Sequence, residues 1–228
     1  MNKLYKDFTL AKINDPEYSH IKLLLFWPIY GIVFLLLERF LPLNFHDISC
    51  KIDAYIPFCE YFIIPYYSWF VFIIGALIYT LFSDIKAFRK YMIYITISYS
   101  LTVLIYFIYP SMQTLRPSVF ERNNVFVDIV KFLYSFDTNT NTCPSLHVIG
   151  MFGSVYGLLN TKKFSTPFWR IFLCISSILV CSSTVFLKQH SIIDLFAGCF
   201  VSLIVYKVTE KIENGRIPQT EKQKKLKV

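Results

Sequence analysis

Two histidines, a serine, an arginine and an aspartate occur in the second half of the chain, in an order that suits phosphate chemistry. Ser145 and His147 lie in one short segment, Arg116 precedes them, and His190 and Asp194 follow. In-line transfer of a phosphoryl group through a histidine needs a nucleophilic imidazole, an acid for the leaving group and donors for the phosphate oxygens. These five residues supply all three kinds of group, so the sequence predicts a phosphate-handling site.

His190 and Asp194 are spaced for one face of a helix. A separation of four residues stacks two side chains, so Asp194 can accept from one imidazole nitrogen and leave the other as a nucleophile. An aspartate in an apolar span is costly unless it has a partner, which makes Asp194 a functional candidate. The alternative interpretation is a structural His–Asp pair that only neutralises itself.

Ser145 and His147 are expected at a helix N-terminus. The polar run before them predicts an N-cap at Asn141 or Thr142 and places Pro144 in the first helical turn. Free backbone N–H groups bind anions there, Ser145 adds a hydroxyl, and His147 can protonate a leaving alkoxide. The alternative is a capping serine beside an interfacial histidine.

Arg116 and Lys188 are the candidate cations. Pro117 favours extended backbone at Arg116, whose forked guanidinium matches two phosphate oxygens. Lys188 stands two residues before His190. In a helix these two side chains would point about 200° apart, whereas in an extended segment both would point the same way. For each cation the alternative is a side chain that snorkels to the membrane surface.

The composition is that of an integral membrane protein. Of the 228 residues, 55% are hydrophobic and 18% are aromatic, which is too apolar for a soluble domain of this length. A spanning helix needs about 20 mostly apolar residues. Six segments approach this length: Ile21–Leu43, Phe62–Phe82, Tyr91–Tyr109, Pro144–Asn160, Phe168–Leu187 and Ser191–Val208. We therefore expect a single all-α domain over residues 1–228, a polytopic bundle of six transmembrane helices.

The distribution of Lys and Arg predicts the orientation of this bundle. With six spans, both termini, the 83–90 loop and the 161–170 loop lie on the same side of the membrane. That side carries 17 of the 23 Lys and Arg residues. The positive-inside rule makes that side cytoplasmic and places the active site at the outer face, in the plasma membrane. The net charge of +8 belongs mostly to these loops and the Lys-rich tail, so no nucleic-acid partner is expected.

The outer loops carry two further features. Apolar residues recur at helical spacing over 126–133, which predicts a short amphipathic helix on the membrane surface or on the bundle. Cys50 and Cys59 share the first outer loop, and a disulfide between them is left open. No Cys/His cluster has the spacing of a zinc site, so no metal is expected.

The motifs resemble those of the type-2 phosphatidic acid phosphatase and vanadium haloperoxidase superfamily, and the six spans resemble its membrane-bound lipid phosphatase branch. The matching residues are Arg116-Pro117, Pro144-Ser145-Leu146-His147 and Ser183…His190…Asp194, within about 100–208. The resemblance implies that His190 attacks phosphorus, that Asp194 orients it and that His147 protonates the leaving group. It also implies that Arg116 and Ser145 bind phosphate oxygens, with Ser183 a further candidate, and that no metal or cofactor takes part.

The sequence departs from the family pattern at two positions. Tyr109 stands where the family usually has a lysine, and Thr184 where it usually has an arginine, so two customary phosphate-binding cations are absent. We expect Lys188 to compensate if it faces the pocket.

The resemblance then implies a lipid phosphatase or phosphotransferase acting on a phosphomonoester or pyrophosphate lipid through a phosphohistidine. The sphingolipid-synthase-like branch, which also lacks the third-motif arginine, suggests headgroup transfer between phosphodiester lipids instead, and a third alternative is a membrane protein that only binds phosphate.

Overall fold

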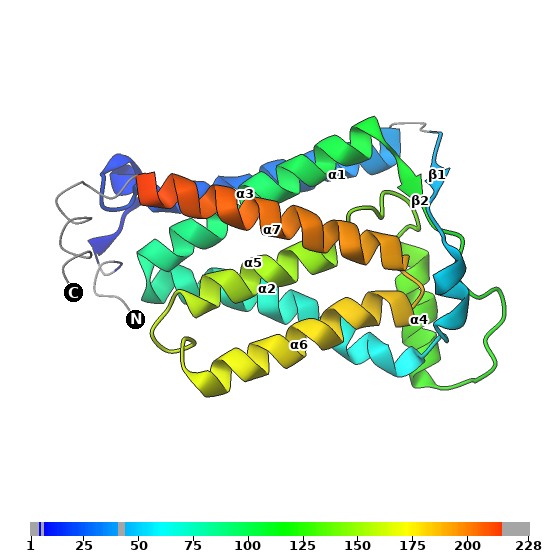
Figure 1. The fold of residues 1–228 in the computed structure, drawn as a ribbon. Coiled ribbons are helices and arrows are strands. Elements are labelled where there is room, and N and C mark those ends of the chain that lie inside the picture. The colour runs from blue at the N-terminus through cyan, green and yellow to red at the C-terminus, as the bar shows by residue number, and fades with distance from the viewer. Residues whose placement is uncertain (1–4, 6, 41–43, 216–228) are drawn as a thin grey trace.

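The chain folds into a predominantly α-helical bundle, as expected. The computed structural model describes residues 5, 7–40 and 44–215. Its helices are α1 (Phe26–Phe40), α2 (Ile63–Ser83), α3 (Ile85–Ile108), α4 (Val125–Phe136), α5 (Leu146–Leu159), α6 (Pro167–Phe186) and α7 (Ile192–Gly215) (Figure 1). Short 3₁₀ turns cover Leu10–Asn14, Ser19–Leu25, Lys51–Tyr55 and Glu60–Phe62, and two short parallel strands pair, β1 (His46–Asp47) with β2 (Ser111–Met112).

Five helices are long and apolar enough to cross a membrane. They are Ser19–Phe40, Glu60–Ser83, Ile85–Ile108, Pro167–Phe186 and Ile192–Gly215. The sixth expected segment forms α5, an apolar helix of 14 residues. At 1.5 Å per residue α5 is about 21 Å long, which is less than the ~30 Å hydrocarbon core of a bilayer.

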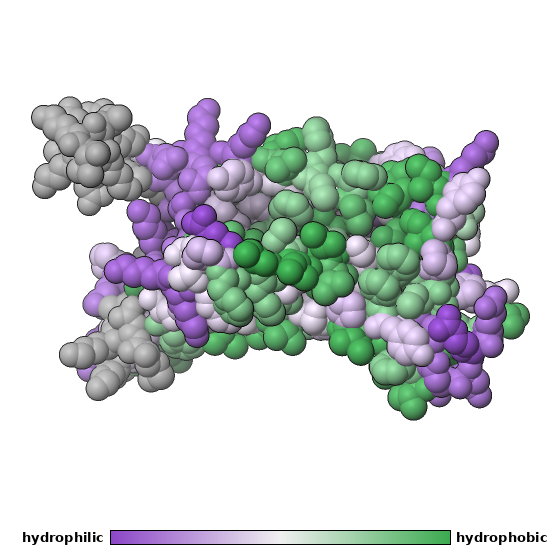
Figure 2. All heavy atoms as spheres, turned by 60° about the horizontal axis from the view of Figure 1, so that its bottom comes forward, coloured by the Kyte–Doolittle hydropathy of each residue, from purple (hydrophilic) through white to green (hydrophobic). Residues whose placement is uncertain are grey.

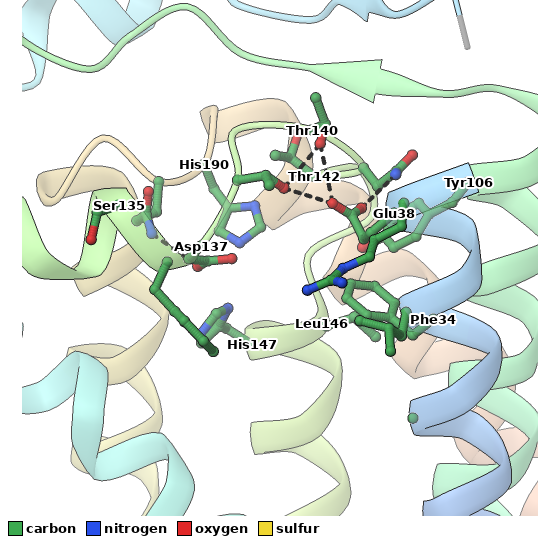
Figure 3. A pocket seen from close by; sticks show the side chains of 17 residues that line it. Phe34, Glu38, Tyr106, Ser135, Asp137, Thr140, Thr142, Leu146, His147 and His190 are labelled. Carbon is green, nitrogen blue, oxygen red and sulfur yellow. Dashed lines mark hydrogen bonds between the residues drawn. The ribbon is translucent and has the colours of Figure 1, made fainter. Parts of the chain in front are cut away.

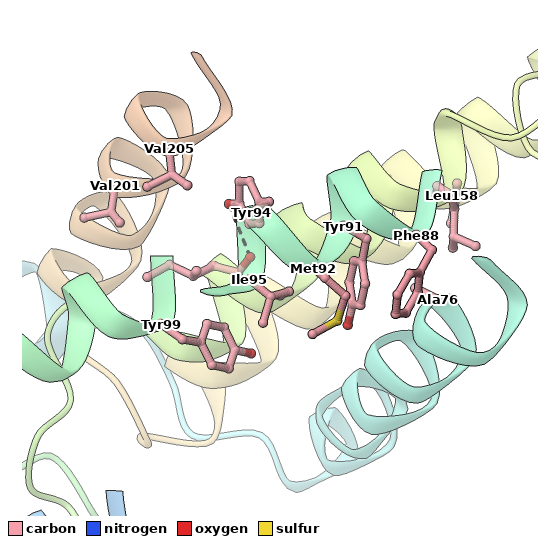
Figure 4. Packing of buried hydrophobic residues seen from close by; sticks show 12 residues of the cluster. Ala76, Phe88, Tyr91, Met92, Tyr94, Ile95, Tyr99, Leu158, Val201 and Val205 are labelled. Carbon is pink, nitrogen blue, oxygen red and sulfur yellow. Dashed lines mark hydrogen bonds between the residues drawn. The ribbon is translucent and has the colours of Figure 1, made fainter. Parts of the chain in front are cut away.

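The short helix α5 occupies the centre of the bundle. It packs against α2, α3, α6 and α7. Glycines permit the closest approaches: a Cβ at Gly153 would lie 2.8 Å from the Tyr94 ring, and one at Gly150 would lie 2.6 Å from the Tyr99 hydroxyl. Small residues at a helix interface let membrane helices pack tightly, and tyrosines of α3 fill the resulting core (Figure 4). These two glycines lie within the first eight residues of α5, close to Ser145 and His147.

The bundle has two different ends. Figure 1 shows the α2–α3 turn, the α5–α6 loop and the last turns of α7 at one end. The opposite end holds α4, the two strands and the first turns of α5 and α7. Apolar side chains dominate the middle of the molecule in Figure 2, and hydrophilic ones gather toward both ends. The predicted catalytic residues of α5 and α7 therefore share one end with α4.

The helix boundaries in the structure agree in part with those predicted from the sequence. The amphipathic helix predicted over 126–133 is confirmed as α4, which buries Val127, Val130 and Leu133. Helix α3 begins six residues before the expected span, since the Asp84 side chain accepts a hydrogen bond from the Ala87 N–H and caps it. Residues 41–43 of the expected first span lie outside the described residues. Cys50 and Cys59 are free thiols in the structure.

Candidate active site

A cavity of about 610 Å³ lies at the end of the bundle that carries α4 (Figure 3). Its walls come from five places far apart in the sequence: the second half of α1, Tyr106 of α3, the end of α4 with the segment that follows it (135–142), the first turn of α5 and the turn that precedes α7. Figure 3 shows His147 and His190 on one wall and Glu38 of α1 on the opposite wall. Two of the five residues predicted to handle phosphate, His147 and His190, thus line one cavity.

His190 and Asp194 form the expected pair. The His190 Nδ1 atom lies 3.0 Å from Asp194 Oδ2, and the Asp194 side chain is fully buried. The same oxygen accepts a hydrogen bond from the Ser191 N–H at 3.1 Å. The His190 Nε2 atom has no hydrogen-bond partner among the described residues. This arrangement fixes the ring through one nitrogen and leaves the other free beside the cavity.

His147 faces His190 across a short gap. The two ring centroids are 5.5 Å apart with an interplanar angle of 71°. The His147 ring also packs against Tyr66 and Trp69, with centroid distances of 4.4 and 4.7 Å, and its carbonyl accepts from Trp69 Nε1 at 3.0 Å. The His147 Nδ1 atom has no partner in the described part of the chain. The two imidazole rings are therefore in edge contact, and both border the same cavity.

Ser145 is the N-cap of α5, so the expected cap at Asn141 or Thr142 is wrong. Ser145 is extended (φ −66°, ψ 117°), its N–H donates to the Asp194 carbonyl at 3.1 Å, and the Pro144 carbonyl accepts from the Tyr106 hydroxyl at 2.7 Å. These bonds hold residues 144 and 145 outside the helix. The buried Ser145 hydroxyl has no partner among the described residues, and it sits beside the free N–H groups of α5.

Arg116 reaches the site indirectly. Its Nη2 atom donates to the carbonyls of Asp137 and Thr138, both at 2.9 Å, and to Gln189 Oε1 at 2.5 Å. Its guanidinium also lies over the Tyr134 ring, 4.4 Å from the centroid. Burial lowers the pKa of the Arg116 guanidinium. In this arrangement Arg116 ties the end of α4 to the residue before His190 and does not line the cavity.

Lys188 points away from the cavity. Its backbone is left-handed (φ 53°), which is neither the helical nor the extended geometry considered from the sequence. The amine donates to the carbonyls of Asp53 at 2.7 Å and Ile56 at 2.5 Å, and burial lowers its pKa. Ser183 is likewise occupied, since its hydroxyl donates to the Val180 carbonyl of its own helix at 2.6 Å. Neither side chain belongs to the cavity wall.

Two aspartates that the sequence analysis did not select bond to residues next to the His190–Asp194 pair. Asp53 accepts from the Ser191 hydroxyl at 2.7 Å and the Ile192 N–H at 2.8 Å, so it caps α7 next to His190. Asp137 lines the cavity and accepts from the Tyr66 hydroxyl at 3.0 Å and Gln189 Nε2 at 2.9 Å. Burial raises the pKa of the Asp137 carboxyl above its ordinary value.

Glu38 and Arg39, in the last turn of α1, were also missed as site residues. Glu38 accepts from the Thr138 hydroxyl at 2.8 Å and from Asn141 Nδ2 at 2.6 Å, and it lines the cavity with Arg39. The sequence contains one feature that could have identified them: two ionisable residues side by side at the end of an apolar span are functional candidates.

Comparisons with known proteins give no relative. No protein-family model, curated protein or solved structure matches this chain. The described residues also contain no group of three or more His, Cys, Asp or Glu side chains placed to hold a metal ion.

Proposed function

We propose that this protein is an integral membrane enzyme that cleaves a lipid phosphate ester through a phosphohistidine, in the manner of the superfamily its motifs resemble. The observation that carries the proposal is the His190–Asp194 pair, 3.0 Å apart, with the His147 ring 5.5 Å from the His190 ring. The unpartnered Ser145 hydroxyl at the start of α5 supplies a donor for phosphate oxygens. Buried polar groups without partners are rare, and a bound phosphate would satisfy this one.

The proposed reaction has two steps. The Nε2 lone pair of His190 forms a bond to phosphorus, the bond from phosphorus to the leaving oxygen breaks, and protonated His147 gives that oxygen its proton. Asp194 stabilises the positive charge that develops on the His190 ring. In the second step neutral His147 takes a proton from water or a lipid hydroxyl, whose oxygen attacks phosphorus and releases His190. Water gives hydrolysis, and a lipid hydroxyl gives transfer.

The shape of the cavity supports a lipid substrate. Along α1 its wall changes from Gly31, Phe34 and Leu35 to Glu38 and Arg39. These residues lie at helical spacing on one side of α1, and Gly31 to Glu38 covers about 10 Å along the axis. An acyl chain fits the apolar part and a phosphate headgroup fits the polar part. We further propose six spans, counting α5, with both termini cytoplasmic and this cavity at the outer face of the plasma membrane.

The charges around the cavity favour the second candidate reaction, headgroup transfer between phosphodiester lipids. A phosphomonoester carries about −1.5 to −2 at neutral pH, whereas a phosphodiester carries one charge. The Lys188 amine is bonded to backbone carbonyls, and the Arg116 Nη2 atom is engaged at the end of α4. The carboxyls of Glu38 and Asp137 line the same cavity. Few positive charges therefore balance the substrate, which suits a monoanion better than a dianion.

The test is turnover of purified protein on a panel of lipid phosphomonoesters, pyrophosphates and phosphodiesters, with the His190→Ala protein as the blank. We expect turnover above the blank for at least one lipid, inhibition by vanadate and full activity in EDTA. Released inorganic phosphate identifies a phosphatase, and a labelled headgroup that appears on an acceptor lipid without free phosphate identifies a transferase. Activity lost in EDTA and restored by magnesium would contradict the mechanism.

A larger side chain at Gly31 should make the enzyme discriminate between chain lengths. A Cβ at Gly31 meets no atom within 4 Å, and the residue lines the cavity. In Gly31→Leu we expect a loss of about tenfold in kcat/KM for long-chain substrates, since one side chain in an apolar pocket changes specificity by about 10- to 200-fold. A short-chain analogue should lose little. Gly75 also has open space but does not line this cavity, so Gly75→Leu is the matched control. Equal losses on both chain lengths would argue against an acyl site on α1.

A further inference from the structure

We propose that Arg39, the basic residue in the last turn of α1, binds the non-bridging oxygens of the substrate phosphate and replaces the cations that the motifs lack. The inference builds on the proposed function and names a recognition residue for the same site. Arg39 lines the cavity together with His147 and His190. Among the described residues that form this wall, it is the one Lys or Arg side chain.

The Arg39 guanidinium is available for a ligand. Within the described part of the chain it has no hydrogen bond or ion pair, although Glu38 is its neighbour in sequence. Arg116 and Lys188, the cations expected from the sequence, donate to carbonyl oxygens and to Gln189. A guanidinium presents two parallel N–H groups that match two phosphate oxygens, so one free arginine can hold a phosphodiester monoanion.

Glu38 fixes the end of α1 where Arg39 can reach the cavity. It accepts from Thr138, Asn141 and, at 3.4 Å, Thr140. The 138–141 segment that carries these partners is itself anchored to β2 and to the residue after it. The Asn141 N–H donates to the Ser111 carbonyl at 2.5 Å, and the Gln113 N–H donates to the Asn139 carbonyl at 3.0 Å. The hydrogen bonds of Glu38 thus join α1, which lies at the edge of the bundle in Figure 1, to the loop that lines the cavity together with His190.

The first experiment measures turnover of the best substrate from the panel by wild type, Arg39→Gln and Arg39→Lys. For Arg39→Gln we expect KM to rise about 10- to 100-fold with kcat changed less than about threefold, the pattern of a lost charge-assisted bond to the ground state. Arg39→Lys should recover part of the affinity, since it keeps the charge and loses the fork. Arg122→Gln is the matched control, because Arg122 pairs with Glu60 at the same end and does not line the cavity.

The second experiment measures binding without turnover, in maltoside micelles that contain no phosphate. The probes are a short-chain phosphodiester lipid, inorganic phosphate and the corresponding diacylglycerol, each titrated into His190→Ala and into His190→Ala with Arg39→Gln. We expect the added Arg39→Gln change to weaken phosphodiester lipid binding about 10- to 100-fold and to leave diacylglycerol binding unchanged. A parallel loss for inorganic phosphate would identify the phosphate itself as the ligand, whereas a loss confined to the lipid would identify the intact headgroup.

The two experiments separate this inference from the proposed function. Arg39-dependent binding without turnover on any substrate would support Arg39 as a phosphate ligand and overturn the enzymatic proposal. His190-dependent turnover with unchanged KM in Arg39→Gln would overturn the role of Arg39 and keep the enzyme. Absence of phosphodiester binding in the His190→Ala protein would also count against Arg39.

Discussion

Replacing His190 by alanine should abolish turnover on every substrate, whereas the effect of replacing His147 on the first step should depend on whether the leaving group needs a proton. His190 supplies the bond to phosphorus in the proposed mechanism, so His190→Ala should lose at least about 10⁴-fold in kcat for any ester. His147 supplies a proton, so His147→Ala should lose about 10²- to 10⁴-fold for a lipid alkoxide. With a p-nitrophenyl ester, whose leaving group departs without protonation, the loss in the first-turnover rate of p-nitrophenol release should shrink to under about tenfold, while steady-state turnover still needs His147 as the base of the second step.

The control for both substitutions is His46→Ala. His46 lies at the same end of the molecule and stacks on Tyr109, with ring centroids 4.4 Å apart, but it does not line the cavity. Its kcat should remain within about twofold of wild type, as expected for a surface site away from the chemistry. The mechanism would be contradicted if His190→Ala retained the p-nitrophenyl activity, or if the first-turnover rate of His147→Ala fell equally with both leaving groups.

The parts of the site that were predictable follow from local periodicity. A separation of four residues between His190 and Asp194 predicted a pair on one helical face; His190 lies just before α7, which begins at Ile192, and the structure still joins the two side chains at 3.0 Å. The apolar spacing over 126–133 likewise identified α4. Both predictions depend on neighbours within about one helical turn, where sequence spacing translates directly into geometry.

The parts that were not predictable depend on contacts between distant segments. Glu38 meets Thr138 from 100 positions away in the chain, so no periodicity connects α1 with the cavity. The direction of Lys188 is set by a left-handed backbone and by carbonyl acceptors in the 51–56 turn. The start of α5 moved to Leu146 because the Asp194 carbonyl takes the Ser145 N–H. Tertiary partners thus decided the positions of these groups.

The length of α5 has a similar cause. Helices that face lipid must satisfy a hydrocarbon core of about 30 Å, and the five long helices do so. Helix α5 packs against α2, α3, α6 and α7, so protein surrounds its sides. Irregular backbone at membrane depth is tolerated where protein or a cavity covers it. Because α5 is short, the non-helical residues before Leu146 can line the cavity, which then lies inside the end of the bundle that carries α4.

Replacing Asp194 by asparagine should remove most of the rate and little of the binding. Asp194 Oδ2 accepts from His190 Nδ1 at 3.0 Å, which requires the proton on Nδ1 and leaves a lone pair on Nε2. An asparagine can present its NH₂ group to Nδ1, which shifts the proton to Nε2 and blocks the attacking nitrogen. By analogy with the carboxylate of a catalytic triad, kcat should fall about 10³- to 10⁴-fold while KM changes less than about threefold.

Asp84→Asn is the matched control for this substitution. Asp84 is also a carboxylate at the start of a long membrane helix, and its side chain accepts from the Ala87 N–H at 3.0 Å. Because asparagine caps helices about as well as aspartate, Asp84→Asn should preserve both stability and turnover. The nitrogen chemical shifts of isotope-labelled His190 report which ring nitrogen carries the proton. A substitution with only a structural effect would leave these shifts unchanged. Two results would show that Asp194 does not act through the nucleophile. One is a kcat of Asp194→Asn equal to that of wild type, and the other is a lower kcat while the tautomer of His190 stays the same.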